Sequence, residues 1–312
     1  MQELMQKIEE NKQKLQNLLK DKDNLTELNK WLKTELAYTS NAIEGNTLTR
    51  KETALVIEEK ITTGAKPIND YLEALNHAKA FDFIIQSTNE HARIDENYVL
   101  QIHKIILSGI NDTNAGFYRS VRVRIAGSQT ILPNPLKVPD LMYEFGKWLE
   151  SENGNAVFKA IEAHYKLVSI HPFVDGNGRT ARLLLNAILL ENGYLPIIIR
   201  PIDRKRYLKS LETYQTLGNK EPYYHFMLSA LNRSIKTAIG LLDINQPDAG
   251  KDFITIGKLA ELAGVPISTA RYYMKIGKLR AVTFTPSGYA LFEVKQAQAL
   301  KKLSQKKQGT KS

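Results

Sequence analysis

The segment HPFVDGNGRTAR, residues 171–182, combines a histidine, a carboxylate, two glycines around an asparagine, and two arginines. Within it, only the imidazole of His171 can take a proton near neutral pH. Asp175 can hold a hard cation such as Mg²⁺, which binds phosphates through one or two carboxylates and several waters. A base, a metal carboxylate, an anion site and two arginines together indicate phosphoryl or nucleotidyl transfer to a hydroxyl.

The helix boundaries around this segment follow from Pro172 and the glycines. Pro172 disfavours helical geometry at the residue before it, so a helix over 155–170 is expected to end at about His171. The next helix is expected to start near Arg179, which leaves DGNG as a loop whose backbone N–H groups suit phosphate oxygens. Arg179 and Arg182 then lie on one helix face and can bind further phosphates.

Other interpretations of these residues have less support. DGNG can form a hairpin turn, but its flanks are helical in pattern rather than strand-like. A Walker-type phosphate loop, a dinucleotide glycine fingerprint and an H-E-x-x-H zinc pair are all absent from the sequence. His164, on roughly the same helix face as His171, is expected to be a buried helix residue rather than a ligand.

The composition of the 312-residue chain, 43% hydrophobic and 24% charged, is typical of a soluble globular protein. The apolar runs are too short to span a bilayer and the N-terminus lacks the apolar core of a secretion signal, so we expect a cytoplasmic location. With no cysteine, disulfides and thiol nucleophiles are excluded. Residues 251–312 contain twelve Lys or Arg against three acids, so nearly all of the net charge of +10 lies there.

Hydrophobic periodicity predicts a mainly α protein. Helical patterns cover residues 1–40, 50–62, 68–87, 95–108, 137–152, 155–170 and 179–193, with more helix to about 243. Residues 116–135, here called the flap segment, differ, because Val121, Val123 and Ile125 alternate with Arg122 and Arg124. This period of two predicts a strand, as one arm of a hairpin.

The C-terminal part is predicted to be a separate small domain after a linker at 245–252. Residues 252–300 are typical of a winged helix-turn-helix: two helices around a Gly-Val-Pro turn, then two short strands. The basic tail, 301–312, is expected to be disordered. Lysines and arginines on or after the second helix would allow phosphate contacts with DNA, although such modules also bind proteins: Arg271, Lys275, Lys278 and Arg280.

HPFVDGNGRTAR resembles the signature of the Fic family, H-x-F-x-[D/E]-G-N-G-R-x-x-R, without departure at any specified position. The resemblance implies a Fic-type helical bundle with a β-hairpin flap, at residues 61–244. It also implies an enzyme that moves AMP from ATP to a Ser, Thr or Tyr hydroxyl of a protein, with Mg²⁺ as cofactor.

The resemblance assigns a role to each residue of the motif. His171 would deprotonate the target hydroxyl, Asp175 would bind Mg²⁺, and Phe173 would anchor the loop in the core. The phosphates would be held by Gly176, Asn177, Gly178, Arg179 and Arg182, the last of these at the γ-phosphate.

Outside the motif, the resemblance implies further nucleotide contacts. They would come from the flap segment, at Val123, Arg124, Ile125 and Ala126, and from Tyr207 and Gln215 downstream. Gln215 is the weaker assignment, because the family often has Asn at that position.

The segment SNAIEGN, residues 40–46, looks like the inhibitory motif [S/T]-x-x-x-E-[G/N] of some Fic proteins. In those proteins the glutamate, here Glu44, pairs with the second motif arginine, here Arg182, and keeps the γ-phosphate from docking. The physical reason is that a carboxylate and a phosphate compete for the same guanidinium donors. We place this motif in an N-terminal helical region at residues 1–60.

The leading hypothesis is therefore an autoinhibited protein adenylyltransferase that uses ATP and a protein target, which can include the protein itself. A second is a DNA-binding regulator with a nucleotide-sensing Fic module. A third is the same fold with another donor, or one that removes AMP. The sequence leaves open a homodimer and whether residues 252–312 contact DNA or a protein.

Overall fold

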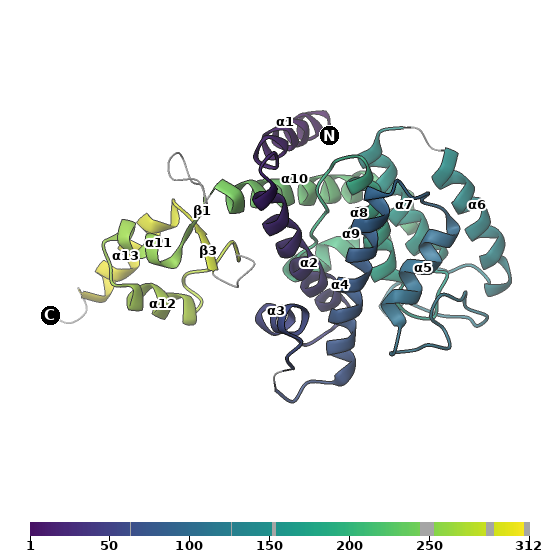
Figure 1. Ribbon diagram of the computed structural model, residues 1–312, viewed down its shortest axis with the longest axis horizontal. Helices are drawn as coiled ribbons and strands as arrows, with labels where there is room; N and C mark the ends of the chain where they lie inside the picture. The colour runs from purple at the N-terminus through teal and green to yellow at the C-terminus, as the bar shows by residue number, and fades with distance from the viewer. Residues whose placement is uncertain (63, 126, 152–153, 244–252, 285–289, 309–312) are drawn as a thin grey trace. The chain divides into compact units, whose positions relative to one another are not determined.

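The computed structural model describes residues 1–312 except 63, 126, 152–153, 244–252, 285–289 and 309–312 (Figure 1). The chain divides into two compact units. Unit 1 consists of residues 1–12 and 32–234, and unit 2 of residues 13–31 and 235–312. The linker expected at 245–252 lies outside the described residues.

Unit 1 is built from helices, as the periodicity predicted. Three long helices contribute to both units: α1 (Gln2–Leu18), α2 (Lys22–Glu44) and α10 (Glu221–Asp243). The others in unit 1 are α3 (Arg50–Glu59), α4 (Ile68–Asn89), α5 (Glu96–Leu107), α6 (Val138–Ser151), α7 (Ala156–Ile170), α8 (Asn177–Glu191) and α9 (Arg204–Leu217), with short 3-10 turns at η1 (Pro135–Lys137) and η2 (Pro201–Asp203).

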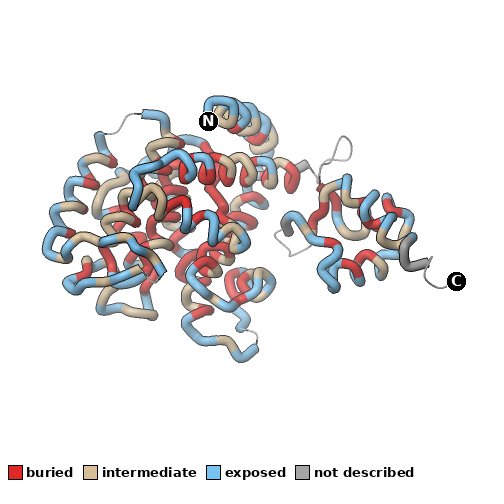
Figure 2. Tube along the Cα trace, turned by 180° about the vertical axis from the view of Figure 1, so that it is seen from behind, coloured by how far each residue is buried: buried red, intermediate tan, exposed pale blue. Residues whose placement is uncertain are grey.

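Helix α8 is the centre of unit 1. Every residue from Leu183 to Leu189 is buried, so this part of the helix needs packing partners on all sides. Helices α4, α5 and α7 pack against it and supply that cover. Figure 2 shows the buried positions of unit 1 gathered in its interior, where the first turn of α8 carries the motif residues.

The strand expected in the flap segment is not formed among its described residues, which contain neither helix nor strand apart from the turn η1. The prediction was wrong because an alternating pattern fixes only which side chains share a face, whereas a strand also needs a partner for its backbone groups. Val121 and Ile131 are exposed, at 54% and 94%, so this segment covers no core of its own.

Unit 2 contains the expected helix-turn-helix and strands. Helices α11 (Ile256–Ala263) and α12 (Ile267–Lys275) are joined by a turn in which Gly264 has a φ of 65°. Strand β1 (Phe253–Thr255) precedes these helices, and the two expected strands, β2 (Thr283–Phe284) and β3 (Ala290–Glu293), follow them. The three strands form an antiparallel sheet of order β1-β3-β2. Side chains from both helices and from the sheet form one small core.

The tail was expected to be disordered from residue 301, but helix α13 (Gln296–Gln308) continues through most of it. Leu300 is fully buried and Leu303 packs against the same core, so one face of this basic segment is apolar at helical spacing. Residues 309–312 lie outside the described residues. In the described part of the chain, no helix has the length and apolarity needed to cross a membrane.

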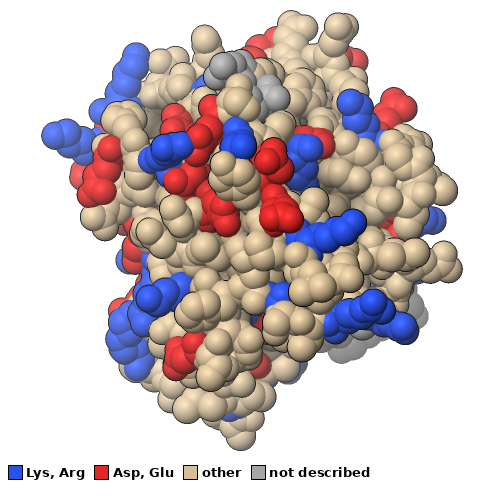
Figure 3. Space-filling model, turned by 90° about the vertical axis from the view of Figure 1, so that its right-hand side faces the viewer, with Lys and Arg blue, Asp and Glu red and all other residues tan. Residues whose placement is uncertain are grey.

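The surface of the molecule mixes both signs of charge on the face shown in Figure 3, where Lys and Arg side chains lie next to Asp and Glu. Ion pairs such as Arg93–Glu150 and Lys147–Glu144 are of this kind. This agrees with the small net charge of residues 1–250, and it leaves the C-terminal region as the basic part of the chain.

Candidate active site

His171 is the C-cap of α7, where the expected helix end is confirmed. Pro172 disfavours helical geometry at this residue, and the backbone of His171 is left-handed, with φ 52° and ψ 58°. The ring Nδ1 lies 3.3 Å from Val168 O. A carbonyl can only accept, so Nδ1 carries the proton and Nε2 has the free lone pair. Burial lowers the pKa of His171 below 6.5, which keeps the ring neutral and ready to accept a proton.

The loop after His171 turns into α8 earlier than expected. Gly176 adopts φ 76°, and α8 begins at Asn177 rather than near Arg179. The side chain of Asn177 fixes this turn, because its Oδ1 accepts from Phe173 N and its Nδ2 donates to Phe173 O, both at 2.9 Å. The side chain of Asn177 is thus used within the protein, and only backbone N–H groups of the first turn of α8 remain for an anion.

The loop rests on a buried aromatic pair. Phe173 is fully buried, as expected, and its ring stacks on His103 of α5 at 3.6 Å between centroids. His103 Nδ1 accepts from Gly116 N, and Nε2 therefore donates to Asp175 O, each at 3.0 Å. Burial lowers the pKa of His103 to about 4, so the ring stays neutral and keeps this donor pattern. His103 thereby joins the motif loop to the start of the flap segment.

Arg182 is the most completely bound residue of the motif. Its Nε donates to Ser40 Oγ at 2.9 Å, and Nη2 donates to Ser40 O at 3.0 Å and to Glu44 Oε1 at 2.7 Å. Burial alone would lower the pKa of Arg182, but the Glu44 carboxylate and the Tyr207 hydroxyl raise it. The pairing of Glu44 with Arg182 is thus present in the structure, with the guanidinium 7% exposed.

Glu44 also lies over the first turn of α8. A Cβ added to Gly178 would collide with Glu44 Oε1 and lie 3.0 Å from Arg182 Nη1. Glu44 is the last residue of α2, where the helix dipole disfavours a carboxylate, whereas the N-terminus of α8 favours one. The carboxylate therefore occupies the position that an anionic ligand of these groups would take.

Arg179 has carboxylate partners that the sequence did not indicate. Its Nη1 donates to Glu73 Oε1 of α4 at 2.7 Å, and its Nη2 to Asp175 Oδ2 at 3.0 Å. Glu73 also accepts from Nδ2 of Asn46, the last residue of SNAIEGN, at 2.8 Å. Both motif arginines are thus paired with acids, and Glu73 links one of them to the chain that carries Glu44.

Tyr207 does not face an open surface. It is 1% exposed, and its hydroxyl lies 2.8 Å from His164 Nε2, while Tyr223 OH lies 2.7 Å from His164 Nδ1. His164 is fully buried, as expected, and burial lowers its pKa to about 3. The hydroxyl of Tyr207 also interacts with the guanidinium of Arg182, so Tyr207 helps to hold that guanidinium in place.

The flap segment is joined to α9 at its tip. Glu212 Oε1 accepts from Ser128 Oγ at 2.7 Å and from Gln129 N at 2.9 Å. Gln215 accepts from Thr130 Oγ1 at 3.1 Å and donates to Ser169 Oγ of α7 at 3.1 Å. Of the residues expected near the nucleotide, Val123 and Ile125 are half-buried, Arg124 is exposed and Ala126 lies outside the described residues.

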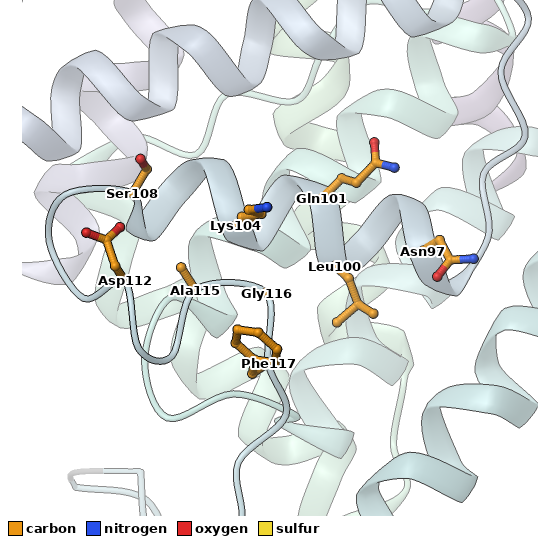
Figure 4. A pocket seen from close by; sticks show the side chains of 9 residues that line it. All are labelled: Asn97, Leu100, Gln101, Lys104, Ser108, Asp112, Ala115, Gly116 and Phe117. Atoms are coloured by element: carbon orange, nitrogen blue, oxygen red, sulfur yellow. The ribbon is translucent and has the colours of Figure 1, made fainter.

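A cavity of about 540 Å³ lies beside α5, away from the motif. Side chains of α5 and of the chain from Ser108 to Phe117 surround it, including Leu100, Lys104 and Asp112 (Figure 4). None of the motif residues lines it. The chemistry and geometry of the motif, rather than the size of this cavity, therefore identify the candidate active site.

Sequence reasoning missed three residues that build the site: Glu73, His103 and Arg119. Each comes from another element and acts through a contact that has no local pattern. Only Arg119 had a signal, because it lies two residues before Val121, the first of the alternating residues of the flap segment.

Comparison with known proteins identifies relatives of the part of the chain that contains these residues. Residues 93–189 match the model of the Fic/DOC family, and residues 255–292 match that of the MerR family regulatory proteins. The chain is 35% identical over 241 residues to "Protein adenylyltransferase Fic" of Nematostella vectensis, which covers 75% of this chain and 55% of that protein. The namesake from Drosophila grimshawi is 34% identical over 201 residues, 64% of this chain and 41% of its own length. The chain thus spans about half the length of these curated relatives.

Solved structures show the same fold. Fic-1 of C. elegans, residues 134–508, has a TM-score of 0.68 at 29% identity, covering 77% of this chain and 71% of that one. A Fic domain containing signaling protein of Bacteroides thetaiotaomicron has a TM-score of 0.69 at 27% identity and is covered over its full length, with 78% of this chain. The matched residues include the whole of HPFVDGNGRTAR, and we conclude that this chain contains a Fic/DOC family domain.

Proposed function

We propose that this protein transfers AMP from ATP to a hydroxyl of a protein side chain. The observation that carries the proposal is the arrangement at the start of α8: a neutral imidazole with a free Nε2, a helix N-terminus with unpaired N–H groups, and two buried arginines. The relatives named protein adenylyltransferase support it.

The residues supply the parts of an in-line displacement. His171 Nε2 takes the proton of the target hydroxyl, whose oxygen forms a bond to the α-phosphorus of ATP. The bond from that phosphorus to the α–β bridging oxygen breaks, and pyrophosphate leaves with the bond's electron pair. The N–H groups at Asn177 and Gly178 stabilise the charge that develops on the α-phosphate, and Arg179 and Arg182 bind the outer phosphates.

The donor set at Asp175 suits Mg²⁺ shared with a nucleotide. Its carboxylate side chain is 63% exposed, and one oxygen accepts from Gly176 N at 2.6 Å while the other accepts from Arg179. Groups of three or more potential metal ligands are absent among the residues that the structure describes. A single exposed carboxylate fits an ion that takes its remaining ligands from phosphates and water. When bound there, Mg²⁺ would neutralise phosphate charge.

We further propose that Glu44 inhibits this reaction. Its carboxylate holds Nη2 of Arg182 and lies over Gly178, so an incoming γ-phosphate meets both an occupied guanidinium and a like charge. Release of Glu44 would free the arginine without moving α8. Coupling energies of regulatory contacts correspond to changes of about 5- to 150-fold.

The test compares AMP transfer by four proteins: wild type, Glu44→Gly, Glu44→Gly with His171→Ala, and Glu59→Gly. Glu59 is the matched control, because it is also an exposed glutamate at the end of a helix but has no part in the site. We expect Glu44→Gly to raise incorporation of labelled AMP by about 10- to 100-fold, and His171→Ala to abolish the gain. Equal incorporation by wild type and Glu44→Gly would refute the inhibitory role.

Mass spectrometry after incubation with Mg²⁺ and ATP identifies the transferred group. A mass increase of one AMP, on this protein or on an added protein, supports the proposal. An increase of one phosphate indicates kinase chemistry. If ATP binds and no protein gains mass, a nucleotide-sensing regulator explains the chain better than an enzyme does.

DNA contact through unit 2 is a second proposal, supported by the match to the MerR family model and by exposed basic side chains after α11. These exposed residues are Arg271, Lys275, Lys278, Arg280, Lys301 and Lys302. Gel shifts with the full chain at increasing salt test it, because phosphate contacts weaken steeply with salt. Replacement of Arg271 and Lys275 by Ala should weaken any shift, and an unchanged shift would exclude α12 as the contact.

A further inference from the structure

One guanidinium joins the flap segment to the motif segment. Arg119 Nε donates to His171 O at 2.8 Å. Its Nη1 donates to Val121 O at 3.1 Å, and its Nη2 to Pro133 O at 2.8 Å. The backbone N–H of Arg119 also donates to Pro172 O at 2.9 Å. All three guanidinium nitrogens are therefore used, each on a different peptide carbonyl.

The charge of Arg119 has no acidic partner in the described part of the chain. The residue is 3% exposed, and burial lowers its pKa. Burying a cation is unfavourable unless polar groups replace its water, and here carbonyl oxygens do so. An apolar side chain would fill the same space at lower cost, so packing alone does not account for an arginine at this position.

The bonds of Arg119 act on strained backbone. His171 has φ 52°, a left-handed conformation that is unfavourable for a non-glycine residue. Arg119 binds the carbonyl of His171 and that of Pro172, which are the two peptide groups directly after the strained residue. These bonds favour the backbone conformation that sets the direction of the imidazole.

The same guanidinium closes the flap segment at its base. Val121 lies near the beginning of the flap segment and Pro133 near its end, and Arg119 binds both carbonyls at once. The tip is separately held by Glu212 and Gln215 of α9. Arg119 is therefore the side chain that binds both ends of the flap segment and also the carbonyl of His171.

We propose that Arg119 is a positioning residue for the transfer reaction, holding His171 and the flap segment in fixed register. A target hydroxyl presented along the flap segment then meets Nε2 of His171 at the α-phosphate. Arg119 itself touches neither nucleotide nor target. This inference rests on the proposed function, since it assigns a role within the same site.

The test uses Arg119→Lys in the Glu44→Gly protein. Lysine keeps the positive charge but has a single nitrogen, which cannot reach three separate carbonyls in one plane. We expect kcat for AMP transfer to fall on the order of 10²-fold, because small misplacement of reacting groups has effects of that size. The Kd for ATP, measured by calorimetry, should change by less than about threefold, since no phosphate-binding group contacts Arg119.

Hydrogen exchange provides the second measurement. Amides of residues 121–133 should exchange about tenfold faster or more in Arg119→Lys, because the base of the flap segment is no longer closed. Arg122→Lys is the matched control: Arg122 is an exposed arginine of the same segment, so kcat, Kd and exchange should all stay unchanged. If Arg119→Lys does not fold, Arg119→Gln, which keeps a planar group with two donors, takes its place.

The outcomes separate the two proposals. Parallel losses of kcat, ATP affinity and thermal stability in Arg119→Lys would show a merely structural residue and overturn the inference. If Glu44→Gly binds ATP but transfers no AMP, the proposed function fails. Hydrogen exchange then still tests the positioning role of Arg119, because unchanged exchange of residues 121–133 would contradict it.

Discussion

The motif segment, residues 171–182, and the flap segment, residues 116–135, contain no strand among their described residues, yet they differ in how far their side chains are buried. In the motif segment, Phe173 is fully buried and the side chains of Asn177 and Arg182 have all their partners inside the protein. In the flap segment, Ile131 is 94% exposed and Arg124 is also exposed. The side chains of the motif segment find their partners within the protein, whereas the flap segment is held at its base and its tip.

This difference fits the work that each region would do. Groups that stabilise charge on a reacting phosphate act best when they are oriented before the substrate arrives, and burial provides that orientation. A segment that receives a second protein must instead leave backbone and side chains open to it. The following predictions test this contrast, first where the effect is largest.

Replacing Phe173 with Ala should cost about 3–5 kcal/mol in the free energy of unfolding, because a fully buried aromatic ring is lost. The stacking on His103 is lost with it, so the start of α8 should also lose its affinity for ATP. Urea unfolding measures the first effect and calorimetry the second. A loss below about 1 kcal/mol would mean that the motif loop does not depend on this packing.

Lower pH should destabilise unit 1 through the buried histidines around the motif. Burial lowers the pKa of His77 and His164 to about 3 and that of His103 to about 4, against an ordinary value of 6.5. As pH falls below 6.5, these histidines therefore bind protons in the unfolded chain but stay neutral in the folded protein. Each histidine should reduce stability by about 1.4 kcal/mol per pH unit from pH 6 to pH 5.

Urea unfolding at several pH values measures this slope. His164→Asn removes one of the three groups, so its slope should be smaller by about one proton even if the variant is less stable at every pH. The same slope in wild type and His164→Asn would show that His164 does not stay neutral in the folded protein.

The smallest effect is expected in the flap segment. Ile131→Ser should change the free energy of unfolding by less than about 0.5 kcal/mol, because the side chain is almost fully exposed. The Kd for ATP should stay within about twofold. Destabilisation comparable to that of Phe173→Ala would remove the contrast between the two segments.

Much of the fold was predictable because helical periodicity is local. The end of α7 followed from Pro172, the buried state of Phe173 and His164 was expected, and the winged helix-turn-helix followed from a Gly-Val-Pro turn and two short strands. The wrong start of α8 and the helix found in the tail have local causes too. The start of α8 depends on Asn177 closing onto Phe173, and α13 on an apolar face within a basic tail.

The sequence by itself determined which residue types are available for the proposed chemistry. HPFVDGNGRTAR brings a histidine, a glycine-rich turn and two arginines into one segment, and SNAIEGN contains the glutamate that pairs with one of these arginines. Tertiary structure alone decided which distant groups complete the site: Glu73 on Arg179, His103 under Phe173, and Arg119 between His171 and the flap segment. The contacts of Glu73 with Arg179, of His103 with Asp175 and of Arg119 with His171 join residues 50 or more positions apart. Their geometry depends on how helices pack rather than on any pattern along the chain.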